Sequence, residues 1–153
     1  MGAAVSAPVI NDVSTHLEDP PTFSSKSSHP AALSEGVKAA CRKAYADVQP
    51  LAVPGGDAAA VFSAAKRAAA SLARVQIVHE DEAAGSLELL DTTRLMRYKD
   101  DVAVRVRRAA DGGGVVVDVR SASRVGKGDL GCNAARIRQY LAALRGELGL
   151  SAS

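Results

Sequence analysis

Residues 101–121 have the sequence DVAVRVRRAADGGGVVVDVRS, and this stretch decides the fold. From 101 to 108, valines alternate with charged or small residues, which is typical of a β-strand with one buried face. The Asp-Gly-Gly-Gly at 111–114 is a strong turn signal. The stretch 114–121 alternates again, so the two segments are predicted to pair as an antiparallel hairpin. The valines predicted to face inward are Val102, Val104, Val106, Val115, Val117 and Val119.

The flanking sequence supplies the remaining elements of an α+β fold. Two earlier strands are predicted at 75–79 and 87–95, which gives a four-stranded antiparallel meander. Three helices are predicted, at 34–48, 58–73 and 130–147, the first two with Ser34 and Asp57 as N-caps. A Pro- and Gly-containing linker is expected at 50–56. Helices packed on one face of such a sheet form a two-layer sandwich.

The N-terminal segment differs in composition from the rest of the chain. Residues 1–33 contain four prolines and a serine-rich run, with no helical or strand period. We predict an extended arm at 1–33 that packs on the domain or on a partner, followed by a single domain at 34–150; a disordered tail is the alternative. The parts at 1–8 and 24–30 have little to bury, so their ordering is expected to need another chain. The first six residues also match the N-myristoylation pattern on Gly2, unless Met1 is only a fragment boundary.

Composition excludes several classes of function. The chain has 153 residues, enough for one domain. Aromatic residues make up 3%, too few for a base-stacking nucleic-acid platform, and a net charge of +2 does not suit a strongly basic duplex binder. Two cysteines are too few for a disulfide framework. No apolar run is long enough to span a membrane.

The densest polar motif joins the last strand to the last helix. It contains the spacing Gly126-x-Gly128-x-x-Gly131, but no second parallel strand or later acid follows, so a dinucleotide site is rejected. A small-anion or partner-binding loop remains open, because basic side chains surround a helix N-terminus. In the alternative, Asp129 caps the helix and the arginines pair with carboxylates. The candidate loop residues are Arg124, Gly126, Lys127, Asp129, Asn133 and Arg136.

Charged residues on the strands are predicted to form a structural ion network. Its candidate members are Asp100, Asp101, Arg105, Asp118 and Arg120. Asp101 is expected to pair with Arg120 if the register allows. At least one Arg–carboxylate pair is expected to be buried, under a helix or under the arm. Asp100 and Asp101 could instead serve acid–base chemistry, but neighbours on a strand point to opposite faces.

No catalytic residue, metal site or cofactor is predicted. The three histidines, His16, His29 and His79, show no ligand spacing, so a zinc site is not expected. Cys132 lies near a helix N-terminus, where a thiolate would be stabilised, but no placed base is visible. We therefore expect Cys132 to be a small packing residue.

Three blocks of sequence stand out: Ile10–Thr15 with Asp19–Phe23, Tyr98–Val106, and Asp118–Gly126 with Asp129–Ile137. Together they resemble the family called domain of unknown function 1499, found in bacteria and plastid-bearing eukaryotes. The resemblance covers about residues 8–148. The chain departs from the family's pattern at two places: members often have Gly-Trp before the first strand, where this chain has Ala73-Arg74, and they often have a serine or another small residue in place of Gly128.

The resemblance implies no established activity, but it suggests the plastid for a eukaryotic member. No transit peptide is visible, so a processed chain is expected, peripheral to a membrane complex or otherwise soluble and intracellular. We expect a non-catalytic accessory subunit that docks on other protein subunits of a larger assembly, such as a plastid photosynthetic membrane complex. Any contact with a membrane is expected to run through those partners. Nucleic acid is not expected to be a partner. The alternatives are the anion-binding loop and, last, a hydrolytic enzyme using Asp100 and Asp101.

Overall fold

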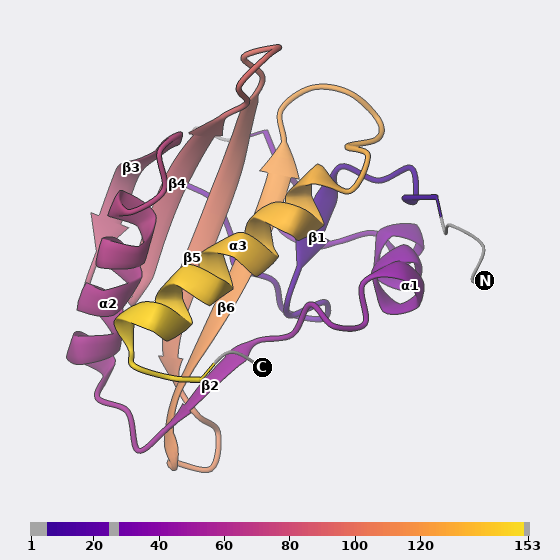
Figure 1. Ribbon diagram of the computed structural model, residues 1–153. Coiled ribbons are helices and arrows are strands. Elements are labelled where there is room, and N and C mark those ends of the chain that lie inside the picture. Colours follow the sequence, from indigo (N-terminus) through magenta and orange to yellow (C-terminus); the bar gives the residue numbers. More distant parts are fainter. Residues whose placement is uncertain (1–5, 25–27, 152–153) are drawn as a thin grey trace.

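The computed structural model describes residues 6–24 and 28–151 (Figure 1). Within them, three helices and a six-stranded antiparallel sheet confirm the predicted α+β class, and the sheet does not close into a barrel. Gly2, the candidate for myristoylation, lies outside the described residues. The elements are β1 (Asp12–Ser14), α1 (Glu35–Ala44), β2 (Leu51–Pro54), α2 (Ala58–Ala70), β3 (Val75–Asp81), β4 (Ser86–Thr92), β5 (Lys99–Arg108), β6 (Gly114–Ser123) and α3 (Cys132–Glu147).

The predicted meander forms the centre of the sheet, and two unpredicted strands extend it. Strands β3 to β6 pair in chain order, while β1 and β2 both pair with the outer edge of β6. Val13 lies opposite Ser121, and Leu51 lies opposite Val117. The linker predicted at 50–56 is therefore wrong for Leu51–Pro54. Strands of three and four residues are too short to give a periodic signal.

One face of the sheet carries the helices and the hydrophobic core. Figure 1 shows α2 and α3 lying side by side across this face, with α1 beside β1. The inward valines of β5 and β6 are buried there, as predicted. Helix α2 packs closely because alanines form its buried side, and the Tyr140 hydroxyl of α3 donates to the carbonyl of Ala65 at 2.9 Å. The predicted caps are present: Ser34 Oγ accepts from the amide of Val37, and Asp57 Oδ2 accepts from that of Ala60.

The arm covers the opposite face of the sheet. The carbonyls of Pro21 and Pro30 both accept hydrogen bonds from Arg120 of β6, and the amide of Ser24 donates to Glu88 of β4. Ser24, His29 and Pro30 bond to their own sheet, whereas the expectation that residues 24–30 need another chain to become ordered stays a prediction. Those three residues are held by polar bonds to the sheet, which a count of apolar side chains cannot anticipate.

Two boundary corrections matter for the surface of the molecule. Strand β4 ends at Thr92, so Leu95, predicted inside a strand, lies in the β4–β5 loop. Helix α3 begins at Cys132, so Leu130, predicted inside the helix, precedes it. Within the described residues, no helix is both long and apolar enough to cross a membrane.

Candidate functional site

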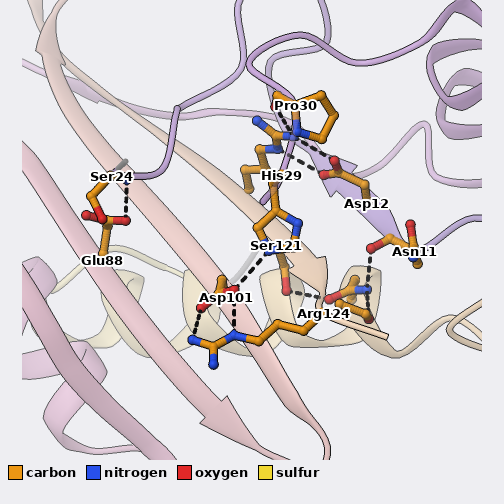
Figure 2. A network of polar contacts seen from close by, with 12 residues as sticks. Asn11, Asp12, Ser24, His29, Pro30, Glu88, Asp101, Ser121 and Arg124 are labelled. Atoms are coloured by element: carbon orange, nitrogen blue, oxygen red, sulfur yellow. Dashed lines mark hydrogen bonds and ion pairs between the residues drawn. The ribbon is translucent and has the colours of Figure 1, made fainter. Parts of the chain in front are cut away.

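Arg120 is the centre of the polar layer beneath the arm. Its side chain has no exposed surface. Nε and Nη2 donate to the two carboxylate oxygens of Asp12 at 2.9 and 2.6 Å, and Nη2 also donates to the carbonyl of Pro30; both partners are labelled in Figure 2. Nη1 donates to the carbonyl of Pro21. The guanidinium also lies 5.1 Å from the centre of the Phe23 ring. A buried Arg–carboxylate pair of the predicted kind is therefore present, but its acid comes from β1.

Asp118 forms a second buried pair on the same face. This carboxylate is fully buried, and it accepts from Arg105 Nε at 2.9 Å and from Arg107 Nε at 2.7 Å. Arg105 also donates to the carbonyl of Asp19 at 2.8 Å, which ties the arm to β5. The two pairs together fasten the arm across the sheet.

Asp101 does not bond to Arg120, contrary to expectation. The register places Ala103 opposite Arg120, and the Asp101 carboxylate instead accepts from Arg124 at 2.8 and 2.9 Å and contacts His29 Nε2 at 2.9 Å (Figure 2). Burial raises the pKa of Asp101, but the hydrogen bonds from Arg124 and His29 outweigh it, so this pKa lies below its usual value.

Asp100 lies on the helix face and does not belong to the network under the arm. Its carboxylate is 2.7 Å from Nη2 of Arg136, whose Nε donates to Asp91 at 2.8 Å. Burial lowers the pKa of Arg136, but Asp91 and Asp100 outweigh this effect and raise it. Because Asp100 and Asp101 point to opposite faces, the two carboxylates do not share a site.

The loop before α3 does not gather its basic residues into an anion site. Arg124 and Arg136 bond to carboxylates on opposite faces of the sheet. Asp129 acts as a cap, because its oxygens accept from the amides of Gly131 at 2.8 Å and Asn133 at 3.1 Å. Asn133 is buried and accepts from the Ser121 hydroxyl at 2.6 Å.

The remaining loop residues have simple surroundings. The carbonyl of Gly126 accepts from the side chain of Asn11, and Lys127 is exposed. Cys132 is exposed, so the prediction that it is a small packing residue is wrong. It is the first residue of α3, and its Sγ lies 3.9 Å from Nη2 of Arg136.

A surface that the sequence interpretation missed lies at one end of the sheet. The β4–β5 loop and the β6–α3 loop leave the sheet at this same end, where the amide of Arg124 donates to the carbonyl of Lys99 at 3.3 Å (Figure 1, top). Residue 9 joins them, since the amide of Asp129 donates to the carbonyl of Ile10. Six of the seven large hydrophobic side chains that are exposed among the described residues belong to these segments. They are Val9, Leu95, Met96, Tyr98, Val125 and Leu130.

Basic side chains surround these apolar ones. We call this surface the basic end and define it by its apolar residues together with Arg74, Arg94, Arg97, Lys99, Arg124 and Lys127, all of them exposed. Asp129 is the acid in these loops, and it is engaged in capping. The mixture of cations and apolar residues at 94–99 could have indicated this surface in the sequence. It was overlooked because the strand was predicted to continue to residue 95.

An open hollow of about 410 Å³ lies at the edge of the basic end. Three arginines reach it, one from the α2–β3 connection and two from the β4–β5 loop. Among the described residues, no carboxylate lies within ion-pair distance of Arg94 or Arg97, and Arg74 Nε is 4.0 Å from Asp91. The lining residues are Ala73, Arg74, Val75, Gln76, Leu90, Thr92, Arg94 and Arg97.

Comparison with known proteins gives a family and no activity. No curated protein and no solved structure matches the chain. A family model described as Protein of unknown function (DUF1499) matches residues 12–144, which is nearly the whole chain and includes β1 and the polar layer beneath the arm. The chain therefore belongs to the DUF1499 family, as the resemblance in its sequence predicted.

Proposed function

We propose that this protein is a non-catalytic accessory subunit that docks onto a larger assembly through its basic end. The observation that carries the proposal is the concentration of exposed large hydrophobic side chains at this end, among cations. Leu95 is 88% exposed and Leu130 is 94% exposed. Burying such a side chain gains about 1.5–3 kcal/mol, which a partner can supply and the isolated chain does not. Exposed apolar side chains that gather on one surface among polar ones mark interaction sites.

Backbone conformation supports the same surface. Leu130 has φ +53° and Arg97 has φ +56°, values that side-chain-bearing residues rarely adopt. Among the described non-glycine residues, these two are the ones with positive φ, and both belong to the basic end. Strain of this kind tends to collect at functional sites.

The two alternative functions have less support in the geometry. Hydrolysis by Asp100 and Asp101 would need a shared site, whereas each carboxylate bonds to a different arginine on a different face. An anion site between Arg124 and Arg136 would need two free guanidiniums on one face. The docking proposal needs neither arrangement.

The assembly that we propose to examine first is a plastid photosynthetic membrane complex. This choice rests on the family resemblance, which extends to plastid-bearing eukaryotes. The exposed cations suit a partner with acidic groups around its docking site, because complementary charge steers association and excludes wrong partners.

The test compares sedimentation of the tagged chain in gently solubilised extracts of cells that normally express it. We expect the wild-type chain to sediment with a larger assembly and Leu95→Ser/Leu130→Ser to sediment at the size of the free chain. Val78→Ser is the control, because Val78 is 52% exposed on β3, away from the basic end. Both variants should keep the wild-type unfolding midpoint when purified. Sedimentation of the wild-type chain as a free monomer, or of the double variant with the assembly, would overturn the proposal.

A further inference from the structure

We infer that the basic end binds directly to the surface of an anionic lipid bilayer, and that the arginine-lined hollow receives a lipid phosphate group. This inference goes beyond the proposed function: it assigns a lipid partner to the same surface, and it can stand or fall independently of that function. It departs from the expectation that any membrane contact runs through other subunits.

The arrangement of the basic end suits the surface of a bilayer. Its most exposed apolar side chains lie on separate loops, with Leu95 and Met96 in the β4–β5 loop and Leu130 in the β6–α3 loop. These side chains come from different loops and are each largely exposed, so each can enter a soft surface independently of the others. A bilayer accommodates protruding side chains without a matching shape, and burying them below the headgroups removes apolar area from water.

The residues around the apolar tips have the chemistry of the membrane interface. Tyr98 is half exposed, and its ring and hydroxyl suit the boundary between acyl chains and headgroups. Arg94, Arg97, Lys99 and Lys127 flank the apolar side chains, and such long cationic chains can keep their charge among phosphates while their stems lie along apolar surface. Basic side chains near an anionic bilayer each add to its affinity.

The hollow at the edge of the basic end suits a phosphate group in both charge and donors. Guanidinium groups present planar pairs of N–H donors that match phosphate oxygens. Arg74, Arg94 and Arg97 supply three such groups, and Gln76 and Thr92 add side-chain donors in the same lining. The nearest acid is the buried Asp91: its Oδ2 accepts from Arg136 at 2.8 Å, and its Oδ1 lies 4.0 Å from Arg74 Nε. Among the described residues, Arg94 and Arg97 have no carboxylate within ion-pair distance, so their charge is available to an anion.

Charge at the far end of the sheet would orient the molecule on such a surface. The β3–β4 turn, the β5–β6 turn and the start of α2 meet there. Among the described residues there, four exposed acids, Asp57, Asp81, Glu82 and Asp111, outnumber the one exposed arginine, Arg108. An anionic surface repels this end and attracts the basic end. The net charge of +2 therefore conceals an axis of charge along the strands.

The test uses the purified full chain and vesicles of phosphatidylcholine, with or without phosphatidylglycerol. We expect sedimentation with the anionic vesicles alone, weakening as salt is raised. Arg74→Gln/Arg94→Gln/Arg97→Gln should lower the partition coefficient about fivefold for each cation removed. Arg108→Gln/Arg138→Gln/Arg145→Gln removes the same net charge elsewhere and should retain most of the binding. Leu95→Ser/Leu130→Ser should abolish the part of the binding that survives at high salt.

Several outcomes would overturn the inference. The first is that the chain binds neutral and anionic vesicles equally, or binds neither. The second is that the two arginine triple variants lose the same amount of vesicle binding. Binding of inorganic phosphate to the three arginines, followed by NMR shifts, without vesicle binding would identify a site for a free anion instead. If the chain sediments with an assembly in extracts but never with vesicles, the proposed function stands and the lipid inference fails. If the chain binds vesicles but sediments with no assembly in extracts, the lipid inference stands and the proposed function fails.

Discussion

Arg120 of β6 and Asp12 of β1 face each other through two hydrogen bonds, of 2.9 Å from Nε to Oδ1 and 2.6 Å from Nη2 to Oδ2. Strand β1 has only three residues, so its backbone pairing alone contributes little. The ion pair holds this short strand in register, and the remaining guanidinium donors hold the two proline carbonyls of the arm. One buried side chain thus orders a long segment with few apolar groups.

We predict that Asp12→Ala destabilises the domain by about 3–5 kcal/mol, because it leaves a buried arginine without its counter-charge. Chemical denaturation measures the change. Asp47→Ala is the matched control: Asp47 also makes a two-bond contact with an arginine, Arg138, but both side chains are about half exposed. The control should cost less than about 1 kcal/mol. Equal losses in the two variants would refute the structural role given to Asp12.

We predict that Asp129→Ala costs about 1 kcal/mol of unfolding free energy, the usual contribution of a helix cap. Its oxygens accept from two amides at the start of α3 and from the side chain of Asn133 at 2.7 Å. Asp57→Ala, which removes the cap of α2, should cost a similar amount and serves as the comparison. Wild-type stability in Asp129→Ala alone would show that the loop before α3 does not depend on this carboxylate.

Sequence patterning predicted the central sheet because its signal is local. The alternation in 101–121 fixed both strands, their turn and their buried face, and the caps at Ser34 and Asp57 placed the starts of two helices. These features depend on neighbours a few residues away. The family resemblance added the involvement of the arm.

The partners of the charged residues could not be predicted in the same way. Asp12 and Arg120 are separated by 108 residues, and only the pairing of β1 with β6 brings them together. Alternation correctly separated Asp100 from Asp101, but it could not show that Arg124 and Arg136 diverge to opposite faces. The basic end was missed for a different reason: strand and helix predictions that ran too long absorbed Leu95 and Leu130.

We predict that the contribution of Asp101 to stability falls as the solution is acidified. Its pKa is lower in the folded state than the ordinary value of 3.8, because the bonds from Arg124 and His29 outweigh burial. The unfolded state therefore takes up this proton first, so the stabilisation is complete above the ordinary pKa and is lost as pH falls through the folded value. The measurement is the unfolding free energy of the wild type and of Asp101→Asn as a function of pH. The difference between the two should be large at about pH 7 and should decrease below about pH 4. When both proteins also carry Arg124→Gln, this difference in unfolding free energy should depend less on pH. A difference that increases in acid would contradict the lowered pKa of Asp101.

We predict that the arm is held by its own sheet in the isolated chain, and that the amide of Ser24 reports this. That amide donates to Oε1 of Glu88 at 2.7 Å, and Glu88 is buried on β4 beneath the arm. Glu88→Ala removes the acceptor, so hydrogen exchange at Ser24 should speed up by about tenfold or more, the loss of roughly one charge-assisted hydrogen bond. Amides of β5 and β6 should exchange as in wild type, since their ladder bonds are unchanged. Glu82→Ala, in the exposed β3–β4 turn, is the control. If Ser24 exchanges at the rate of an unstructured peptide in the isolated wild-type chain, the arm needs another chain after all, and the polar layer beneath it is completed only in an assembly.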